Sequence, residues 1–396
     1  MRFEKLEIAI AGAGIGGLSL AAMLASRGAK VVIYDQMAAP QPVGSGFVLQ
    51  PTGATVLSHM GLLDKAAARG AVINRMHGKL AGSNRTVLEI GYGKARHGIA
   101  IQRVALFDIL LKAAVSAGVT FETSSKAVDM TGGERPTIVL EGGRVTPPAD
   151  LAIDGMGANS PIGHIASKEL GYGALWATVP WPEDGPFHPH ELEQRYFRAS
   201  RMAGVLPVGT ARDGASKMAT FFWSLRNQDI DAWRNSGRDV WIAEVAKMWP
   251  ETVPFAEIAE PVHARYRHHT RKPIAGRRLL RIGDAWHATS PQLGQGANMA
   301  LLDAASLITA LERSATIEDA LDLHLRQRRL HIWLYQTLSL VMTPFYQSDS
   351  KILPVIRDIA IAPTTQLPLM RQLISRLVTG EFLDPVKRIG FDQRVD

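Results

Sequence analysis

Two short glycine-rich stretches contain the residues of this sequence best suited to chemistry. The first is Gly12-Ala13-Gly14-Ile15-Gly16-Gly17, with the spacing G-x-G-x-x-G. A turn of this kind lets a ligand approach the backbone closely, because glycine has no side chain to hold the ligand away. Where such a turn opens a helix, free N–H groups and the positive end of the helix dipole favour phosphate. The first stretch therefore predicts a site for a phosphorylated cofactor.

The elements expected around this turn favour a dinucleotide. Residues 6–11 read as a buried strand, 18–27 as a helix and 30–34 as a second strand, which ends at Asp35. In such a β-α-β unit an acid at the end of the second strand can accept hydrogen bonds from a ribose diol. The residues expected to bind the dinucleotide here are Gly12, Gly14, Ile15, Gly17 and Asp35.

The second stretch lies at residues 281–298 and reads Arg-Ile-Gly-Asp-Ala-Trp-His-Ala-Thr-Ser-Pro-Gln-Leu-Gly-Gln-Gly-Ala-Asn. An acid follows a glycine, and a Gly-Gln-Gly turn opens a helix, so backbone N–H groups are exposed to whatever lies in front of the turn. Together with the downstream Asp303-Ala304, the stretch resembles the second FAD signature of the p-hydroxybenzoate hydroxylase-like (class A) flavoprotein monooxygenases. The resemblance implies that Asp284 bonds the ribityl chain and that the 291–298 loop lies beside the isoalloxazine ring. The residues implied in FAD binding are Asp284, Pro291, Gly294, Gln295, Gly296, Ala297 and Asn298.

Further segments carry the same resemblance. Arg103 begins an Arg-x-x-Leu at the start of an expected helix, 103–116, and the match implies that it reaches the FAD pyrophosphate or ribityl. Residues 203–207 and 221–225 look like the ubiquinone-biosynthesis hydroxylase branch. His287 lies where the family motif usually has a scaffold residue, so we expect packing rather than catalysis.

These elements predict an α/β fold. A Rossmann-like FAD-binding domain is expected to carry an inserted, mostly antiparallel β-sheet substrate domain and a C-terminal helical segment. The predicted FAD-binding domain comprises 1–72, 98–170 and 271–330, the substrate domain 73–97 and 171–270, and the C-terminal helices 331–396. The tail from 317 to 380 reads as helical, with a proline-bearing break at 344–354.

Composition narrows the possible functions. The chain has 396 residues, no cysteine and a net charge of +7, so disulfides and thiolate metal sites are excluded and a reducing cytoplasm is expected. His268-His269 has no helical ligand spacing, and no metal site is predicted. Arginines gather between Glu260 and Asp284, but no nucleic-acid-binding motif accompanies them, which leaves a solvated face or attraction of a phosphorylated cofactor. No stretch is long and apolar enough for a transmembrane helix.

The resemblance implies FAD-dependent hydroxylation of an aromatic or quinone-like small molecule by dioxygen, through a hydroperoxyflavin, with electrons from NADPH or NADH. One motif departs from the family pattern: the usual acid and arginine of its Gly-Ala-Asp-Gly-x-x-Ser-x-x-Arg segment are Met156 and Gly163 here. Direct reduction by a pyridine nucleotide is therefore in question. An FAD-dependent oxidase or reductase, a two-component monooxygenase served by a flavin reductase, and a non-catalytic flavin-binding protein stay open as alternatives.

No catalytic base is identified. The expected substrate pocket lies between the flavin loop and the sheet at 172–225. Strand alternation puts Tyr196 and Arg198 on one face, where they could orient an acidic substrate, although plain core and surface roles are the simpler interpretation. Trp223 is expected in the core, and Gln50 could face the flavin.

Overall fold

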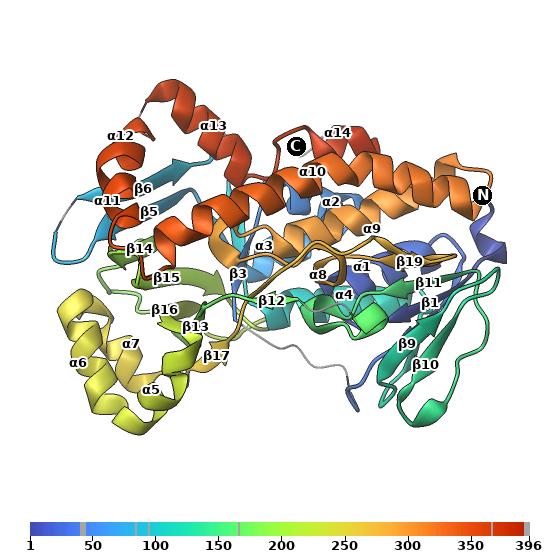
Figure 1. The fold of residues 1–396 in the computed structure, drawn as a ribbon, viewed down its shortest axis with the longest axis horizontal. Coiled ribbons are helices and arrows are strands. Elements are labelled where there is room, and N and C mark those ends of the chain that lie inside the picture. Colours follow the sequence, from blue (N-terminus) through green and yellow to red (C-terminus); the bar gives the residue numbers. More distant parts are fainter. Residues whose placement is uncertain (40–44, 84, 94–95, 165–166, 366, 392–396) are drawn as a thin grey trace.

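A six-stranded sheet supports both glycine-rich turns in the computed structural model, which describes residues 1–39, 45–83, 85–93, 96–164, 167–365 and 367–391 (Figure 1). Its strand order is β19-β20-β11-β1-β2-β8, and β20, β11, β1, β2 and β8 run parallel. The strands are β1 (Glu7–Ala11), β2 (Lys30–Tyr34), β8 (Thr120–Glu122), β11 (Leu151–Asp154), β19 (Ile274–Gly276) and β20 (Leu279–Arg281). Parallel strands end at one edge of a sheet, and ligands bind beyond that edge.

Three helices pack with this sheet and form the largest apolar core. They are α1 (Ile15–Ala25), α4 (Arg103–Ser116) and α9 (Gly296–Arg313), and α1 contacts both of the others. A small sheet of β3 (Phe47–Leu49), β7 (Gly98–Ile101) and β4 (Ala71–Ile73) lies beside α2 (Pro51–His59) and α3 (Leu63–Arg69). Strands β9 (Ala127–Thr131) and β10 (Thr137–Leu140) form a separate antiparallel hairpin, seen at the right of Figure 1.

A seven-stranded sheet forms the other half of the molecule, in the order β17-β13-β16-β15-β14-β5-β6. All neighbouring pairs are antiparallel except β14 and β5. Its strands are β5 (Arg75–Leu80), β6 (Thr86–Gly91), β13 (Tyr172–Pro180), β14 (Glu191–Phe197), β15 (Arg201–Gly209), β16 (Met218–Arg226) and β17 (Val262–Ala264). These strands fall within 73–97 and 171–270, the ranges predicted for the substrate domain, whose boundaries stay a prediction.

One segment of this half, between β16 and β17, differs from what the sequence predicted. Between β16 and β17 the chain forms three helices, where the composition had indicated mainly strands. The helices are α5 (Ile230–Ser236), α6 (Arg238–Met248) and α7 (Val253–Ile258). They cover one face of the sheet, where Trp241, Trp249 and Phe255 pack on Phe221 and Trp223 in a second apolar core. Aromatic residues in this range therefore fill a helix–sheet interface.

The long helix α10 (Ile317–Tyr346) corrects two expectations. The predicted start of the C-terminal helices at residue 331 falls in the middle of this continuous helix, and the division into domains stays a prediction. Pro344 lies inside α10, and the break comes only after Tyr346. Short helices follow: α11 (Leu353–Ile356), a π-helical turn at Arg357–Ile361, α12 (Ala362–Thr364), α13 (Pro368–Val378) and α14 (Pro385–Ile389). In the described part of the chain no helix is long and apolar enough to cross a membrane.

Candidate cofactor-binding site

The two glycine-rich turns meet at one edge of the six-stranded sheet. A Cβ atom added to Gly16 would lie 3.4 Å from the side chains of Ala300 and Ile282, so the start of α1 rests on the start of α9. Gly283 also faces Ala300, at 3.2 Å from such an added atom. Strand β11 separates β1 from β20, and the loops after these strands reach the same edge. The turns are therefore close enough to contact one dinucleotide.

The first turn requires glycine at two positions. Gly12 has a φ of 101°, and a Cβ there would lie 2.8 Å from the carbonyl oxygen of Gly155. A Cβ on Gly17 would collide with the carbonyl oxygen of Gly12. The buried carboxylate of Asp35 accepts hydrogen bonds from the N–H groups of Ala13, at 2.7 Å, and Met37, at 2.9 Å. Asp35 thus holds the turn in shape, and each carboxylate oxygen keeps a free lone pair for a ribose hydroxyl.

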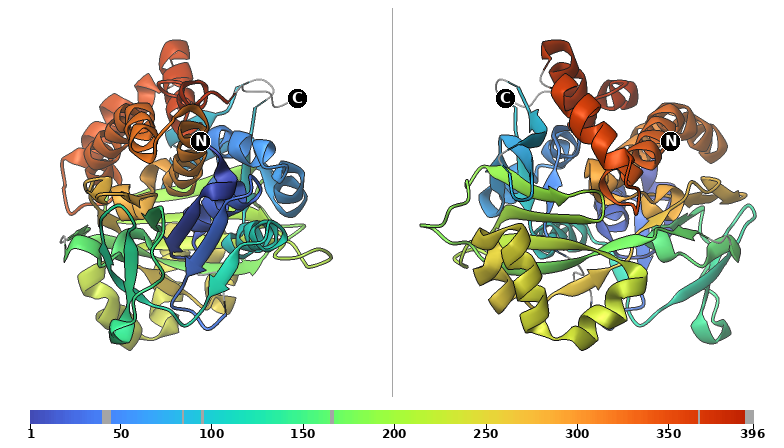
Figure 2. Two further views of the ribbon diagram at one scale, coloured as in Figure 1. Left: turned by 90° about the vertical axis from the view of Figure 1, so that its right-hand side faces the viewer. Right: turned by 60° about the vertical axis from the view of Figure 1, so that its left-hand side comes forward.

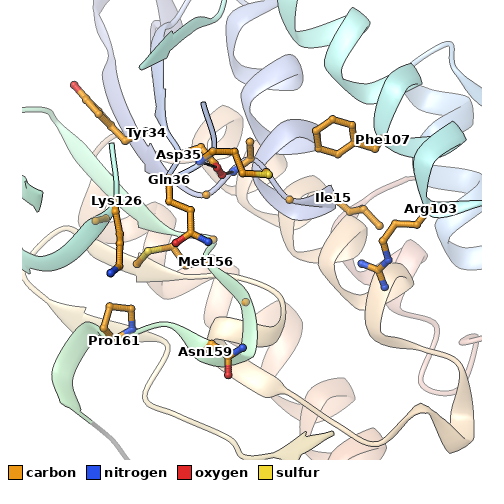
Figure 3. Close-up of a pocket in the computed structure, with 17 residues that line it drawn as sticks. Ile15, Tyr34, Asp35, Gln36, Arg103, Phe107, Lys126, Met156, Asn159 and Pro161 are labelled. Atoms are coloured by element: carbon orange, nitrogen blue, oxygen red, sulfur yellow. Dashed lines mark hydrogen bonds between the residues drawn. The ribbon is translucent and has the colours of Figure 1, made fainter. Parts of the chain in front are cut away.

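A pocket of about 420 Å³ opens in front of this turn (Figure 3). Figure 3 shows Gln36 and Lys126 at one end and Arg103 at the other, so the pocket is elongated along the turn. Gly12, Gly14, Ile15, Asp35 and Arg103 all line it, as expected. Other side chains on the pocket wall were not expected there: Tyr34, Gln36, Met37, Phe107, Lys126, Asn159 and Pro161. Tyr34, Gln36 and Met37 had a local signal because they adjoin Asp35, and Asn159 and Pro161 lie within the motif that contains Met156 and Gly163.

The second turn has the backbone geometry of an anion site. Pro291–Leu293 forms a 3-10 turn, Gly294 follows in the left-handed region with a φ of 61°, and α9 begins at Gly296. Asn298 fastens this turn to the neighbouring chain, because its Oδ1 accepts the N–H of Gln50 at 2.8 Å and its Nδ2 donates to Gly294 at 3.1 Å. No side chain caps the start of α9, which leaves its first N–H groups for a ligand.

Asp284 and Arg103 connect the two turns. Both side chains are solvent-accessible although protein atoms crowd around them, which is the situation of a side chain on the wall of a deep cleft. This crowding raises the pKa of the Asp284 carboxyl and lowers the pKa of the Arg103 guanidinium, and the attraction between the two opposes both shifts. Arg103 also lies over the ring of Phe47, 5.7 Å from its centre. A ligand reaching from the first turn to the second would pass between them.

His287 belongs to the scaffold, as its place in the motif indicated. Its Nε2 lies 2.7 Å from Oδ2 of Asp303, and the same oxygen accepts the N–H of Gly283 at 2.8 Å. Both side chains are completely buried. Asp303 therefore fixes the glycine–aspartate turn that presents Asp284.

The segment after β11, in which Met156 and Gly163 replace the family acid and arginine, is held by hydrogen bonds from buried side chains. Met156 lines the pocket at the position of the family acid. The nearby Asp154 does not replace that acid, because its buried carboxylate accepts the hydroxyl of Ser160 at 2.6 Å and lies 3.5 Å from Nε of Arg281. Arg281 also donates to the carbonyl of Ile162 at 2.9 Å, and Arg271 donates to that of Ser160 at 2.9 Å. Two of the clustered arginines thus order this loop from inside.

The predicted pair of Tyr196 and Arg198 does not form. Tyr196 is buried, and its ring centre lies 5.4 Å from that of Tyr346. Its hydroxyl donates to Oε1 of Gln194 at 3.0 Å. Strand β14 ends at Phe197, and Arg198 has a φ of 53° and is exposed, so alternation fails there. Trp223 lies in the core between the sheet and α5–α7, as expected. Neither Arg198 nor Trp223 lines the pocket in front of the first turn.

Gln50 lies beside the second turn. A Cβ on Gly294 would be 3.9 Å from its Nε2, and the side chain is completely buried. Within the described residues neither polar atom of the Gln50 amide has a hydrogen-bond partner of good geometry, nor has the hydroxyl of Tyr92. Burial raises the pKa of the Tyr92 phenol, and the nearby Gln50 amide opposes this shift. Sequence reasoning missed Tyr92, which has no motif around it.

The site fits FAD. The glycines leave room for a diphosphate, Asp35 and Asp284 have free acceptor positions for two sugar chains, and the start of α9 offers N–H groups to a ring that gains electrons. Among the described residues no group of histidine and acidic side chains could hold a metal ion. The two turns lie close enough together for one dinucleotide to reach both.

Comparisons with known proteins also indicate an FAD-binding protein. The family model described as "FAD binding domain" matches residues 5–335. The chain is 27% identical over 333 residues to 6-hydroxynicotinate 3-monooxygenase of Bordetella bronchiseptica, covering 80% of this chain and 85% of that protein. It is also 27% identical over 327 residues to 3-amino-4-hydroxybenzoate 2-monooxygenase of Streptomyces cremeus, covering 78% and 79%.

Solved structures share the fold. A variant of 2-methyl-3-hydroxypyridine-5-carboxylic acid oxygenase has a TM-score of 0.78 at 20% identity, covering 97% of this chain and 98% of that one. HpxO of Klebsiella pneumoniae, complexed with FAD and uric acid, has a TM-score of 0.78 at 17% identity, covering 95% and 98%. The chain belongs to the FAD binding domain family, among its class A flavoprotein monooxygenases.

Proposed function

We propose that this enzyme uses FAD and dioxygen to hydroxylate an aromatic or quinone-like small molecule. The observation that carries the proposal is the convergence of the two glycine turns, with Gly16 packed on Ala300 and Ile282. The named relatives support the chemistry, because they are monooxygenases of a hydroxynicotinate and an amino-hydroxybenzoate. They give no support to the oxidase or reductase alternative, and closeness to the ubiquinone-biosynthesis branch stays a prediction.

The residues of the chain have separate tasks in this proposal. The N–H groups of the 12–17 turn hold the diphosphate, Asp35 bonds the adenosine ribose, and Asp284 with Arg103 positions the ribityl chain. FAD, when bound, supplies the activation of dioxygen that side chains lack. The 291–298 loop and the start of α9 place N–H groups where negative charge gathers on reduction. Such fixed dipoles stabilise charge without reorganising.

We place the reacting end of the substrate beside Gln50 and Tyr92. Both are buried polar groups, and an unpaired buried polar group is costly unless a ligand satisfies it. Tyr92 packs in an apolar cluster with Val48, Leu206 and Val208. A flat ring with one hydrogen-bonding substituent matches these surroundings. Tyr196, by contrast, already has a partner in Gln194.

For the electron donor of the reaction we propose NADPH or NADH. The thioether of Met156 at the position of the family acid favours one competitor, delivery of reduced flavin by a separate reductase. A stopped-flow test separates the two: the purified flavoprotein is mixed anaerobically with NADPH or NADH, with and without phenols or hydroxypyridines. Bleaching that a substrate accelerates supports direct reduction. Bleaching only after a flavin reductase is added supports the two-component form.

Oxygen transfer itself has a second readout. After reduction, air is admitted and the product is analysed by mass spectrometry with labelled dioxygen. One labelled oxygen atom in the organic product supports a monooxygenase. Quantitative hydrogen peroxide with every substrate tried, and no labelled product, would overturn the proposal and restore an oxidase.

A further inference from the structure

Exposed apolar side chains gather near the C-terminus. Of the eighteen large hydrophobic side chains that are strongly exposed among the described residues, nine lie between residues 340 and 373. Single exposed apolar residues are ordinary, but a contiguous patch marks an interaction surface. Seven of these residues follow α10 and are called here the C-terminal apolar face: Ile352, Val355, Ile356, Ile359, Leu367, Leu369 and Leu373.

The first half of this face is one side of an almost continuous helix. From Leu353 to Thr364 the chain runs through α11, the π-helical turn and α12. Ile352, Val355, Ile356 and Ile359 have the spacing i, i+3, i+4, i+7 of a single helical face, and they are 42–69% exposed. Pro354, Arg357 and Ala362 are buried on the opposite side. The helix therefore packs on the protein with one side and presents aliphatic groups with the other.

Helix α13 is apolar on two sides. Ile374 and Val378 pack in a core cluster with strands of the seven-stranded sheet, and Leu377 packs near Trp286. Leu369 and Leu373, one turn apart, are nevertheless 76% and 44% exposed. A surface helix needs only one apolar side to hold it to its own domain. The second apolar side therefore indicates contact with an apolar surface outside the folded chain.

The charges around the C-terminal apolar face and its projection from the molecule indicate what this surface is. Between residues 350 and 378 the exposed charged side chains of the described chain are basic, namely Lys351, Arg371 and Arg376. Arg376 lies 3.4 Å from the carboxylate of Asp384, and the exposed Asp349 precedes Lys351, so Lys351 and Arg371 are the cations that border the aliphatic side chains. The single acid within this range, Asp358, is paired with the buried Arg357 at 2.7 Å. Helices α11–α13 stand at one end of the molecule, where α13 rises above the neighbouring strands as a ridge (Figures 1 and 2). A projecting aliphatic ridge bordered by cations matches an anionic lipid surface.

We propose that the C-terminal apolar face rests on the surface of an anionic membrane. The contact is interfacial: aliphatic side chains enter the headgroup boundary, and Lys351 and Arg371 meet lipid phosphates. The inference does not depend on the reaction, since no residue of this face lines the pocket in front of the first turn. A second copy of the chain is the competing occupant.

Flotation with lipid vesicles tests the proposal, using the full FAD-loaded chain. We expect binding to phosphatidylcholine vesicles that contain about 30 mol% phosphatidylglycerol, and weaker binding to phosphatidylcholine alone or at high salt. Ile359→Glu/Leu369→Glu should lower the partition coefficient at least about tenfold, because two exposed aliphatic groups that enter the headgroup boundary become charged. Lys351→Gln/Arg371→Gln should weaken binding to the anionic vesicles only.

Val115→Glu is the matched control, since Val115 is 58% exposed on α4, far along the chain from this face. It should bind vesicles like the parent. Flavin content and circular dichroism show that each variant is folded. No vesicle binding by the parent chain, or equal binding by Ile359→Glu/Leu369→Glu, would overturn the proposal. Concentration-dependent sedimentation lost in that variant, without lipid binding, would assign the face to self-association instead.

Discussion

The carboxylate of Asp303 lies 2.7 Å from Nε of Arg328, and both side chains are completely buried. The pair joins α9 to α10 directly beneath the glycine–aspartate turn, whose Gly283 N–H the same carboxylate accepts. The opposite charges and the hydrogen bonds around Asp303 outweigh its burial and hold its pKa well below the ordinary value. The turn that carries Asp284 is therefore supported by an ion pair, of which only Asp303 belongs to the family motif.

Breaking this pair should destabilise the fold. Arg328→Met removes the guanidinium and leaves a buried carboxylate short of a partner, for which we expect a loss of about 3–5 kcal/mol in unfolding free energy. Urea denaturation of the FAD-free chain measures it. Arg326→Met, two residues earlier on the exposed side of α10, is the control and should change stability by less than about 0.5 kcal/mol. Equal stability of the two variants would contradict the role of the pair.

Two buried histidines predict a pH dependence of stability. Burial lowers the pKa of His331 to about 3 and that of His324 to about 4, from 6.5. Nδ1 of His331 accepts from Arg328 at 3.1 Å, which a protonated ring could not do. Between pH 6.5 and about 4 only the unfolded chain binds these protons, so stability should fall as pH falls, by up to about 1.4 kcal/mol per pH unit for each histidine.

Unfolding free energy measured across this pH range tests the prediction. His324→Gln and His331→Gln should each flatten the slope, whatever their effect at neutral pH. Removal of the exposed His188 by His188→Gln controls for the loss of one histidine. Slopes that stay the same in all three variants would show that the buried rings do not cause the effect.

Neighbouring glycines of the first turn should respond oppositely to alanine. In Gly17→Ala the new methyl group collides with the carbonyl oxygen of Gly12, so the turn must open and FAD affinity should fall at least about tenfold. In Gly16→Ala the methyl group meets Ala300 and Ile282 at ordinary contact distance, 3.4 Å, within a helix. Flavin content after purification should therefore be retained in Gly16→Ala. Loss in both variants, or in neither, would contradict the packing described.

Gln50 and Tyr92 should affect the substrate more than the cofactor. Gln50→Leu and Tyr92→Phe remove buried polar groups that have no partner of good geometry among the described residues, so stability should hold or rise. We expect kcat/KM for a hydroxylated aromatic substrate to fall about tenfold or more, with the flavin spectrum unchanged. Tyr196→Phe is the comparison and should cost less, because Tyr196 already bonds Gln194. A greater effect of Tyr196→Phe would move the substrate site toward β14.

Local sequence pattern predicted the elements that flank the cofactor site. Strand β2 and helix α4 have the expected bounds, 30–34 and 103–116, because each is a mostly apolar run that ends at a glycine or polar residue. Helices α5–α7 were missed because Trp233, Trp241 and Trp249 resemble strand residues when their partners across the sheet are unknown. Local signals cannot show which distant surface an aromatic residue covers.

Side chains that meet from distant segments were also beyond sequence reasoning. Lys126 and Tyr92 reach their sites only through the folding of separate strands, and no spacing links them to a motif. The ion pair of Asp154 with Arg281 joins two neighbouring strands that are 127 residues apart in the chain. Arg198 was misplaced because alternation was extended one residue past the end of β14. Pattern rules describe an element but do not show where it stops.

Calorimetric titration with FAD and with ADP tests most directly whether both turns hold one FAD. Asp35→Asn should weaken both ligands, because Asp35 orders the turn that binds the diphosphate end they share. Asp284→Ala should weaken FAD at least about tenfold and leave ADP unchanged, since ADP lacks the ribityl chain and ring. Asp64→Ala, an exposed acid on α3, is the control. FAD affinity unchanged in Asp284→Ala would contradict the account.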